Sequence, residues 1–134
     1  MSPELTQKLM DSYPLLYSEK NVPRIYSKIH DGFRFDDGWY NLVDQLSLEL
    51  ERLNHEGHKI RAVGMKEKFG TLRFITEIYD TPKYTRKSRK AIWDLIMKAE
   101  ADSANICEVC GKSPAKISGT KWLKTTCEEH IRVD

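Results

Sequence analysis

Three cysteines and one histidine near the C-terminal end of the sequence have the types and the spacing of metal ligands. Two residues separate Cys107 from Cys110, two separate Cys127 from His130, and sixteen lie between the two pairs. A pair with this spacing can bend around a zinc ion from a tight turn, and a second pair completes four tetrahedral ligands. The pattern predicts that these four side chains bind one Zn²⁺ ion.

Other interpretations of the four residues are weaker. The chain has three cysteines in all, so they cannot all be paired as disulfides. No apolar run follows the first four residues, which favours a reducing cytoplasm over secretion. A catalytic zinc ion keeps one position open for water, whereas four amino-acid ligands close the shell and indicate a structural ion. The alternative without a metal is a set of buried thiols with a surface histidine.

The residues around the two pairs predict a zinc finger. Gly111 permits a knuckle whose backbone amides point at the thiolates. Residues 115–117 and 121–126 flank a Ser-Gly-Thr turn and predict a short hairpin, and residues 127–130 predict the first turn of a final helix. A knuckle, a hairpin and helix-borne ligands in this order resemble a treble-clef zinc finger.

The N-terminal part of the chain begins with a helix signal. Ser2 can cap the helix, Pro3 suits its first position, and the Ser-Tyr-Pro sequence at 12–14 ends it. Residues 15–35 mix aromatic and polar types without a clear period, which predicts an ordered loop with a helical turn.

The strongest helical pattern of the sequence follows this loop. Its apolar positions form one continuous stripe: Trp39, Leu42, Val43, Leu46, Leu50 and Leu53. Either Asp36 or Asp37 can cap the start of this helix, and residues 54–57 contain its end.

The apolar period changes to two between residues 59 and 79, which predicts a β-hairpin with its turn at residues 68–70. Val63 and Met65 are expected on one face of the first strand. In the second strand the residues expected to share a face with them are Leu72, Phe74 and Thr76.

A third helix is predicted after the hairpin, with Thr81 as its cap and Pro82 at its first position. Its apolar stripe consists of Ile92, Leu95, Ile96 and Ala99. This stripe can cover the hairpin together with the Trp39 helix.

These elements predict an α+β fold, with helices packed on a small antiparallel β-hairpin or sheet and a C-terminal treble-clef-like zinc finger. Residues 1–103 are the expected core, of which 1–35 are the N-terminal helix and ordered loop, and 104–134 are the finger. No flexible spacer separates the two parts, so the finger should pack on the core. A chain of 134 residues that is 40% hydrophobic and 31% charged suits one ordinary domain, and no stretch predicts a membrane span.

Three sequence motifs carry a resemblance to a known group of proteins. They are Asp-Gly-Trp at 37–39, Lys-Glu-Lys-Phe-Gly-Thr-Leu-Arg-Phe at 66–74, and Cys-x-x-Cys-Gly-Lys followed by Cys-x-x-His within 107–130. With these motifs the chain resembles small proteins of bacteriophages and prophages that carry no assigned activity. The resemblance implies a phage accessory protein in the cytoplasm of a bacterial host cell. Such proteins often bind a host protein, in some cases to inhibit a bacterial defence system.

The sequence predicts no enzymatic activity. Treble-clef nucleases carry a histidine base and further metal ligands on the hairpin and helix, but residues 112–126 contain no histidine, asparagine or aspartate. Asp36, Asp37 and Asp44 could form a carboxylate metal cluster, although capping and a solvated helix face explain them as well. His55 and His58 flank Gly57 and are expected in a solvated loop.

Basic residues indicate the alternative function, which is nucleic-acid binding. The candidates are Lys83, Arg86, Lys87, Arg89 and Lys90 in the third helix, and Lys112, Lys116, Lys121 and Lys124 in the finger. The two groups could share one positive face, with Tyr84 or Trp122 stacking on a base. The net charge of +2 does not itself favour nucleic acid, and a solvated helix end or an acidic protein partner explains the same residues. A host protein is the expected partner, nucleic acid is the alternative, and a homodimer is a further one.

Overall fold

Three α-helices and two small β-sheets make up residues 1–131, the part of the chain that the computed structural model describes. The helices are α1 (Pro3–Ser12), α2 (Tyr40–His55) and α3 (Arg86–Ser103). The first sheet contains β1 (Phe33–Arg34), β2 (Lys59–Lys68) and β3 (Thr71–Tyr79), and the second contains β4 (Lys116–Ser118) and β5 (Lys124–Thr126). The predicted α+β class is confirmed.

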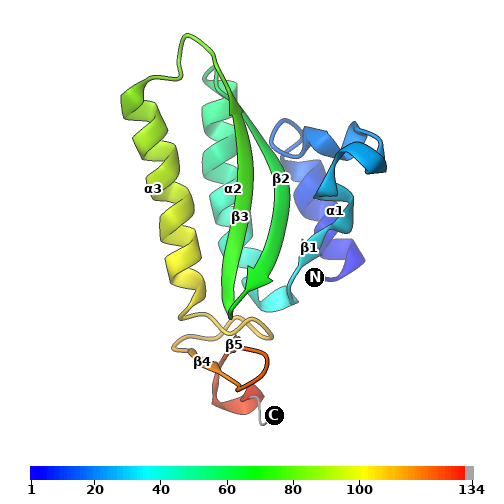
Figure 1. Ribbon diagram of the computed structural model, residues 1–134, viewed down its shortest axis with the longest axis vertical. Coiled ribbons are helices and arrows are strands. Elements are labelled where there is room, and N and C mark those ends of the chain that lie inside the picture. Colours follow the sequence, from blue (N-terminus) through cyan, green and yellow to red (C-terminus); the bar gives the residue numbers. More distant parts are fainter. Residues whose placement is uncertain (132–134) are drawn as a thin grey trace.

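The long β2–β3 hairpin organises the molecule. Helix α2 packs behind it, α3 runs beside β3, and α1 lies on the side of β1 (Figure 1). Strand β1 pairs with β2 in parallel, and β2 pairs with β3 in the antiparallel sense. The C-terminal segment with β4 and β5 lies at one end of the hairpin, where α3 ends.

The core fills the space between the helices and one face of the first sheet. Its largest fully buried side chains include Trp39, Tyr17, Leu9, Leu16, Ile29, Leu50, Ile60 and Leu72. The stripes predicted for α2 and α3 supply Val43, Leu46, Ile92, Ile96 and Ala99. The apolar stripes of these two helices therefore predicted correctly which of their faces are buried.

The starts of α2 and α3 differ from prediction, whereas that of α1 agrees. The Ser2 hydroxyl accepts a hydrogen bond from the Leu5 amide at 3.3 Å, as expected for a cap. Neither Asp36 nor Asp37 caps α2, because a 3₁₀ turn at Asp37–Trp39 precedes this helix and Asp37 instead accepts from the Ser2 amide at 2.7 Å.

Helix α3 begins five residues after the predicted Thr81 cap. Residues 81–84 form a turn, and Thr85 and Ser88 form a reciprocal capping box. The prediction was wrong because a second threonine, with a serine three residues after it, satisfies the helix amides better than Thr81 followed by proline.

Residues 15–35 contain more regular structure than predicted. Three 3₁₀ helices cover Ser18–Asn21, Arg24–Tyr26 and Lys28–Asp31, and β1 follows them. The sequence gave no signal for β1, because a two-residue strand is too short to display a period.

The faces of the hairpin were predicted only in part. Met65 lies opposite Phe74 in the register and both side chains are buried. A register shift between Ala62 and Gly64 removes Val63 from the core, so that Ile60 and Ala62 share the buried face with Met65. A bulge of this kind moves the alternation of side chains by one residue.

Side chains of α3 occupy part of the outer edge of β3. The Leu72 amide donates to the Ser103 hydroxyl at 2.9 Å, and the Phe74 amide donates to the Glu100 carboxylate at 2.9 Å. These bonds satisfy amides that an edge strand would otherwise offer to another chain.

The hairpin turn places a bulky residue in the left-handed backbone region. Phe69 has φ of 54° and Gly70 has φ of 86°, the pattern of a type I′ turn, which favours Asn-Gly. We expect Phe69→Asn to raise the free energy of unfolding by about 1 kcal/mol, because asparagine tolerates this conformation better. Urea unfolding measures the change. Phe69→Leu is the control, for which we expect no increase in the free energy of unfolding. Equal stability of the asparagine variant and the wild type would contradict the prediction.

Candidate metal centre and its junction with the core

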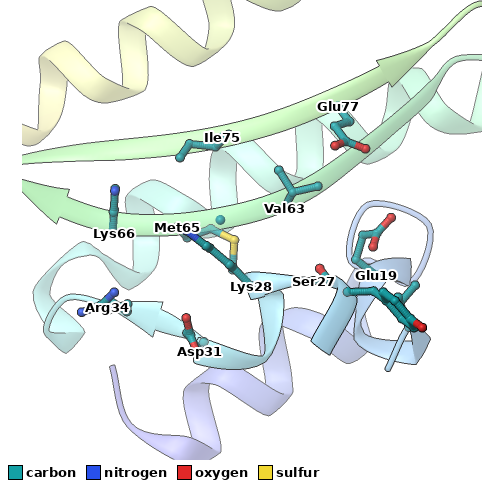
Figure 2. Close-up of a pocket in the computed structure, with 14 residues that line it drawn as sticks. Glu19, Ser27, Lys28, Asp31, Arg34, Val63, Met65, Lys66, Ile75 and Glu77 are labelled. Atoms are coloured by element: carbon teal, nitrogen blue, oxygen red, sulfur yellow. The ribbon is translucent and has the colours of Figure 1, made fainter. Parts of the chain in front are cut away.

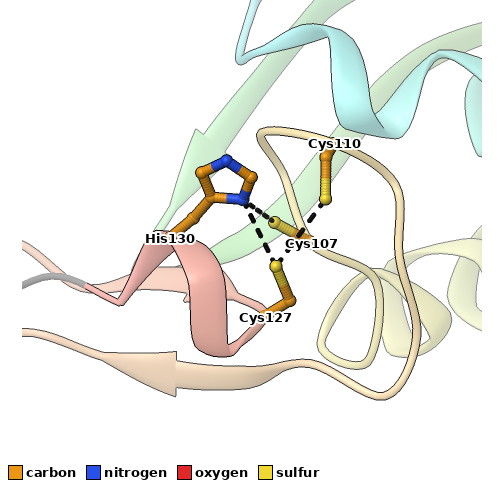
Figure 3. A group of neighbouring side chains, drawn as sticks. All are labelled: Cys107, Cys110, Cys127 and His130. Atoms are coloured by element: carbon orange, nitrogen blue, oxygen red, sulfur yellow. Dashed lines mark hydrogen bonds between the residues drawn. The ribbon is translucent and has the colours of Figure 1, made fainter.

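Cys107, Cys110, Cys127 and His130 converge from three short segments of the C-terminal region. The first two lie on the turn after α3, Cys127 follows β5, and His130 ends a 3₁₀ turn at Glu128–His130 (Figure 3). One potential ligand atom from each lies within 4.8 Å of all the others. The four side chains could hold a metal ion.

The distances between these atoms suit tetrahedral coordination. Zinc–sulfur bonds of about 2.3 Å and zinc–nitrogen bonds of about 2.05 Å give sulfur–sulfur edges of about 3.8 Å and sulfur–nitrogen edges of about 3.6 Å. The Sγ atoms of Cys110 and Cys127 are 3.7 Å apart, and His130 Nδ1 lies 3.6 Å from Cys107 Sγ and 3.2 Å from Cys127 Sγ. The cysteines are free thiols and not disulfides.

Backbone amides prepare Cys107 to be a thiolate. Burial raises the pKa of its thiol, but the amides of Cys127, Cys110 and Val109 donate to the sulfur and lower the pKa to about 6. A thiol must lose its proton to bind a metal, so a lowered pKa favours coordination near neutral pH.

The loop that carries Cys107 and Cys110 closes on itself. The Gly111 amide donates to the Cys107 carbonyl at 2.8 Å, and the Cys107 amide donates to the Lys112 carbonyl at 2.9 Å. Gly111 has φ of 82°, which explains why glycine follows the second cysteine. We call residues 107–112 the knuckle.

The knuckle docks directly on the backbone at the start of the Trp39 helix. The Gly38 amide donates to the Glu108 carbonyl at 2.7 Å. A Cβ atom on Gly38 would collide with the carbonyl oxygens of Cys107 and Glu108, and one on Gly111 would lie 3.0 Å from the Gly38 carbonyl oxygen. Two glycines are therefore required for this close approach.

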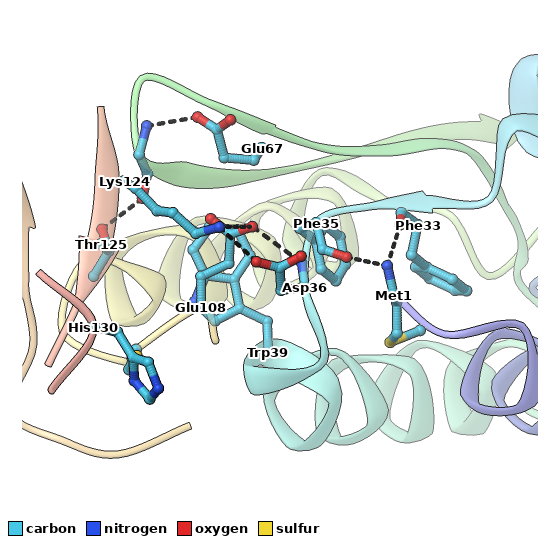
Figure 4. A network of polar contacts seen from close by, with 12 residues as sticks. Met1, Phe33, Phe35, Asp36, Trp39, Glu67, Glu108, Lys124, Thr125 and His130 are labelled. Carbon is cyan, nitrogen blue, oxygen red and sulfur yellow. Dashed lines mark hydrogen bonds and ion pairs between the residues drawn. The ribbon is translucent and has the colours of Figure 1, made fainter. Parts of the chain in front are cut away.

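Polar side chains surround the docked backbone (Figure 4). Glu108 is buried, and its carboxylate accepts a hydrogen bond from the Asp36 amide at 3.0 Å. Lys124 Nζ lies 2.5 Å from Asp36 and 4.0 Å from Glu108. Burial raises the pKa of Glu108, although the Asp36 amide and the Lys124 ammonium lower it.

Two further contacts hold the finger segment to the core. The buried Trp39 indole donates to the Ile106 carbonyl at 2.9 Å, and the Thr125 hydroxyl donates to the Gly70 carbonyl at 2.5 Å. The three sequence motifs at residues 37–39, 66–74 and 107–130 thus meet at this junction. The boundary between residues 103 and 104 stays a prediction, since these contacts join both sides of it.

The structure does not form the single positive face that the basic residues could have shared. The basic start of α3 and the finger lie at opposite ends of this helix, which at about 1.5 Å per residue is about 27 Å long (Figure 1). Lys124 pairs with Asp36, Lys112 pairs with Glu129, and Lys90 pairs with Asp94.

The two aromatic residues proposed for base stacking lie apart from each other. Tyr84 is half-buried and packs its ring at 6.4 Å from that of His58, whereas Trp122 is exposed in the β4–β5 loop.

The structure also separates the carboxylates that the sequence offered as a possible metal cluster, and it places His58 differently from the prediction. Asp44 accepts a hydrogen bond from Tyr13 at 2.6 Å, whereas Asp37 accepts one from the Ser2 amide and Asp36 pairs with Lys124. Among the described residues, the three carboxylates do not form a group that could hold a metal ion. His58 is 8% exposed, so its assignment to a solvated loop was wrong. It is buried because Tyr84 covers it from the turn before α3.

The final helix predicted from residue 127 is a single 3₁₀ turn in the described part of the chain. Residues 132–134 of the predicted finger lie outside the described residues.

The sequence did not predict a groove of about 530 Å³ on the face of the first sheet that lies away from α2 and α3 (Figure 2). Val63 and Ile75 contribute to its floor, and Val22 and Tyr26 to its wall. The bulge in β2 turns Val63 toward the groove, and a bulge has no reliable signal in a single sequence. We call this site the sheet groove.

Comparison with protein-family models, with curated proteins and with solved structures gives no match to this chain. Among the described residues, no helix has the length and apolar character needed to cross a membrane.

The junction gives a test of the close backbone approach. We expect Gly38→Ala to lower the free energy of unfolding by about 2 kcal/mol or more, because the new methyl group collides with the knuckle and breaks the bond from the Gly38 amide. Urea unfolding measures the loss. Gly64→Ala is the matched control, because its Cβ would meet Ile75 at an ordinary 3.6 Å. Equal stability of the two variants would show that the junction does not need glycine.

Proposed function

We propose that the four-residue centre binds one structural Zn²⁺ ion and that residues 104–134 form a treble-clef-like finger. The lowered pKa of Cys107 and the ligand distances support zinc, which favours sulfur and imidazole ligands in a closed tetrahedral shell. The order of knuckle, hairpin and turn-borne ligands supports the treble-clef likeness. The ion holds the knuckle in the shape that fits Gly38.

Metal analysis tests this assignment. We expect about one zinc ion per chain in the purified protein, and a lower content after Cys110→Ser, which removes one ligand. Loss of the ion should make residues 106–122 sensitive to protease while Leu46 and Phe74 stay protected by the core. Val109→Ser, a change at a neighbouring exposed position, is the control with full zinc content. A Cys110→Ser protein with unchanged zinc content and stability would refute the assignment.

We also propose that the protein is a non-enzymatic accessory protein of bacteriophage type that binds a host protein, with inhibition of a bacterial defence system as the role its motifs suggest. The sheet groove is the observation that carries this proposal. Ile75 is 45% exposed on its floor and Tyr26 is 75% exposed on its wall. Exposed aliphatic and aromatic residues around a concave surface are typical anchors of protein interfaces.

The start of α3 supports a second candidate function, nucleic-acid binding. Within residues 1–131, Lys83, Arg86, Lys87 and Arg89 form no ion pair with a carboxylate, unlike Lys90. Exposed cations of this kind can neutralise phosphates, and the affinity then falls steeply with salt. Arg86→Glu, Lys87→Glu and Arg89→Glu together would abolish such binding.

Affinity capture from bacterial lysate distinguishes these functions. We expect a stoichiometric protein partner that is retained at high salt and lost after Tyr26→Ala with Ile75→Ser, because these changes remove the exposed anchors. Trp93→Ala changes an aromatic residue that is 61% exposed on α3 and is the matched control. A partner that survives the groove changes, or salt-sensitive retention of nucleic acid alone, would contradict the proposal.

A further inference from the structure

The sheet groove has charges of opposite sign at its two ends. Arg34 and Lys66 lie at one end, and Glu19 and Glu77 lie at the other (Figure 2). Val63 and Ile75 lie along the floor between these ends. The groove therefore combines an apolar centre with a basic end and an acidic end.

The basic end is a row of cations across the sheet. Arg34 of β1 is the register partner of Lys66 in β2, and Lys66 is in turn the partner of Arg73 in β3. Residues directly opposite one another on neighbouring strands point to the same face, and like charges in such positions repel. An anion bound beside the row would relieve this repulsion.

No carboxylate of the described residues forms an ion pair with the cations of the groove at this end. Within residues 1–131, Arg34 and Lys66 have neither an ion pair nor a side-chain hydrogen bond. Arg73 donates to the Thr71 hydroxyl and to the Leu72 carbonyl, which are neutral acceptors.

The carboxylates at the acidic end also lack an ion pair within the described residues. Glu77 accepts a hydrogen bond from the Tyr79 hydroxyl at 3.1 Å, and Glu19 forms no ion pair within the described chain. Arg61 is the register partner of Glu77, but its guanidinium donates to the Ile60 carbonyl at 3.0 Å.

Two more charged residues line the groove between its ends. Asp31 pairs with Arg24 at 3.7 Å, and Lys28 is exposed.

We propose that the sheet groove binds an extended segment of a partner protein that carries a carboxylate side chain at one end, apolar side chains in the middle and a basic side chain at the other. Lys66 lies opposite Arg73, and Glu77 is four residues further along β3, so the ends are about 13 Å apart. An extended segment of about four residues spans this distance. This inference deepens the proposed binding of a host protein and rests on it.

The charge pattern favours such a segment over nucleic acid. A polyanion gains from Arg34 and Lys66 but places further phosphates beside Glu19 and Glu77, where like charges repel. A segment with both signs of charge complements both ends of the groove.

Selection from a random octapeptide library displayed on phage tests the proposal on the full chain. We expect the enriched peptides to combine an acidic residue, an apolar centre and a basic residue. Arg34→Glu with Lys66→Glu should weaken synthetic copies of these peptides at least about tenfold, and selection on this variant should replace the acidic residue with a basic one. Lys8→Glu with Lys98→Glu makes the same change in net charge at exposed positions outside the groove and should leave the affinity unchanged.

Several results would overturn the inference. Enriched peptides without an acidic residue, affinities that Arg34→Glu with Lys66→Glu leaves unchanged, or tighter binding of an oligothymidylate that these changes abolish would each do so. Thermal unfolding of each variant shows whether it is folded, and Lys66→Gln with Arg34→Gln repeats the test without new charges.

The lysate capture separates this inference from the proposed function. A partner that requires Tyr26 and Ile75 but tolerates the reversed charges refutes only the charge pattern. If the capture yields no partner whose binding depends on the groove, the proposed function is refuted as well.

Discussion

The contact between two backbone segments, at Gly38 and at the knuckle, is the constraint on which the arrangement of this protein depends. A hydrogen bond of 2.7 Å joins them, and a side chain at residue 38 would not fit between them. The start of α2, the turn of the hairpin and the end of α3 all meet the finger at this place. A metal ion that fixes the knuckle would therefore also fix the end of the core, which gives the centre a structural role beyond its own short loops.

Among the described residues, this arrangement leaves an open groove on the other face of the sheet. Helices α2 and α3 cover one face, the finger closes one end, and the 3₁₀ turns before β1 form the wall of a groove on the opposite face. The apolar floor and the charged ends of that groove are not needed by the core, since Val63 lies outside the buried cluster and Ile75 is half-exposed. Exposed apolar residues lower the stability of the folded protein, so such residues are expected at places where they bind a partner.

Much of this could be predicted from the sequence. The paired spacing of the cysteines and His130 identified residues that the structure brings together, and the stripes of α2 and α3 identified their buried faces. The predictions failed where local signals compete or are missing. Thr85 replaced Thr81 as a cap, a bulge turned Val63 out of the core, and the distance along α3 separated the basic clusters. The motifs around Gly38 and Gly70 were visible in the sequence, but only the fold shows that they meet the knuckle.

Hydrogen exchange with and without a chelator tests the central claim most directly. If the metal centre holds the knuckle against the core, removal of the metal should speed exchange of the Gly38 amide at least about tenfold, because its acceptor is the Glu108 carbonyl. Amides in the middle of α2, such as that of Leu50, should exchange at an unchanged rate. Equal exchange of the Gly38 amide in the two conditions would contradict the claim that a metal ion fixes the junction.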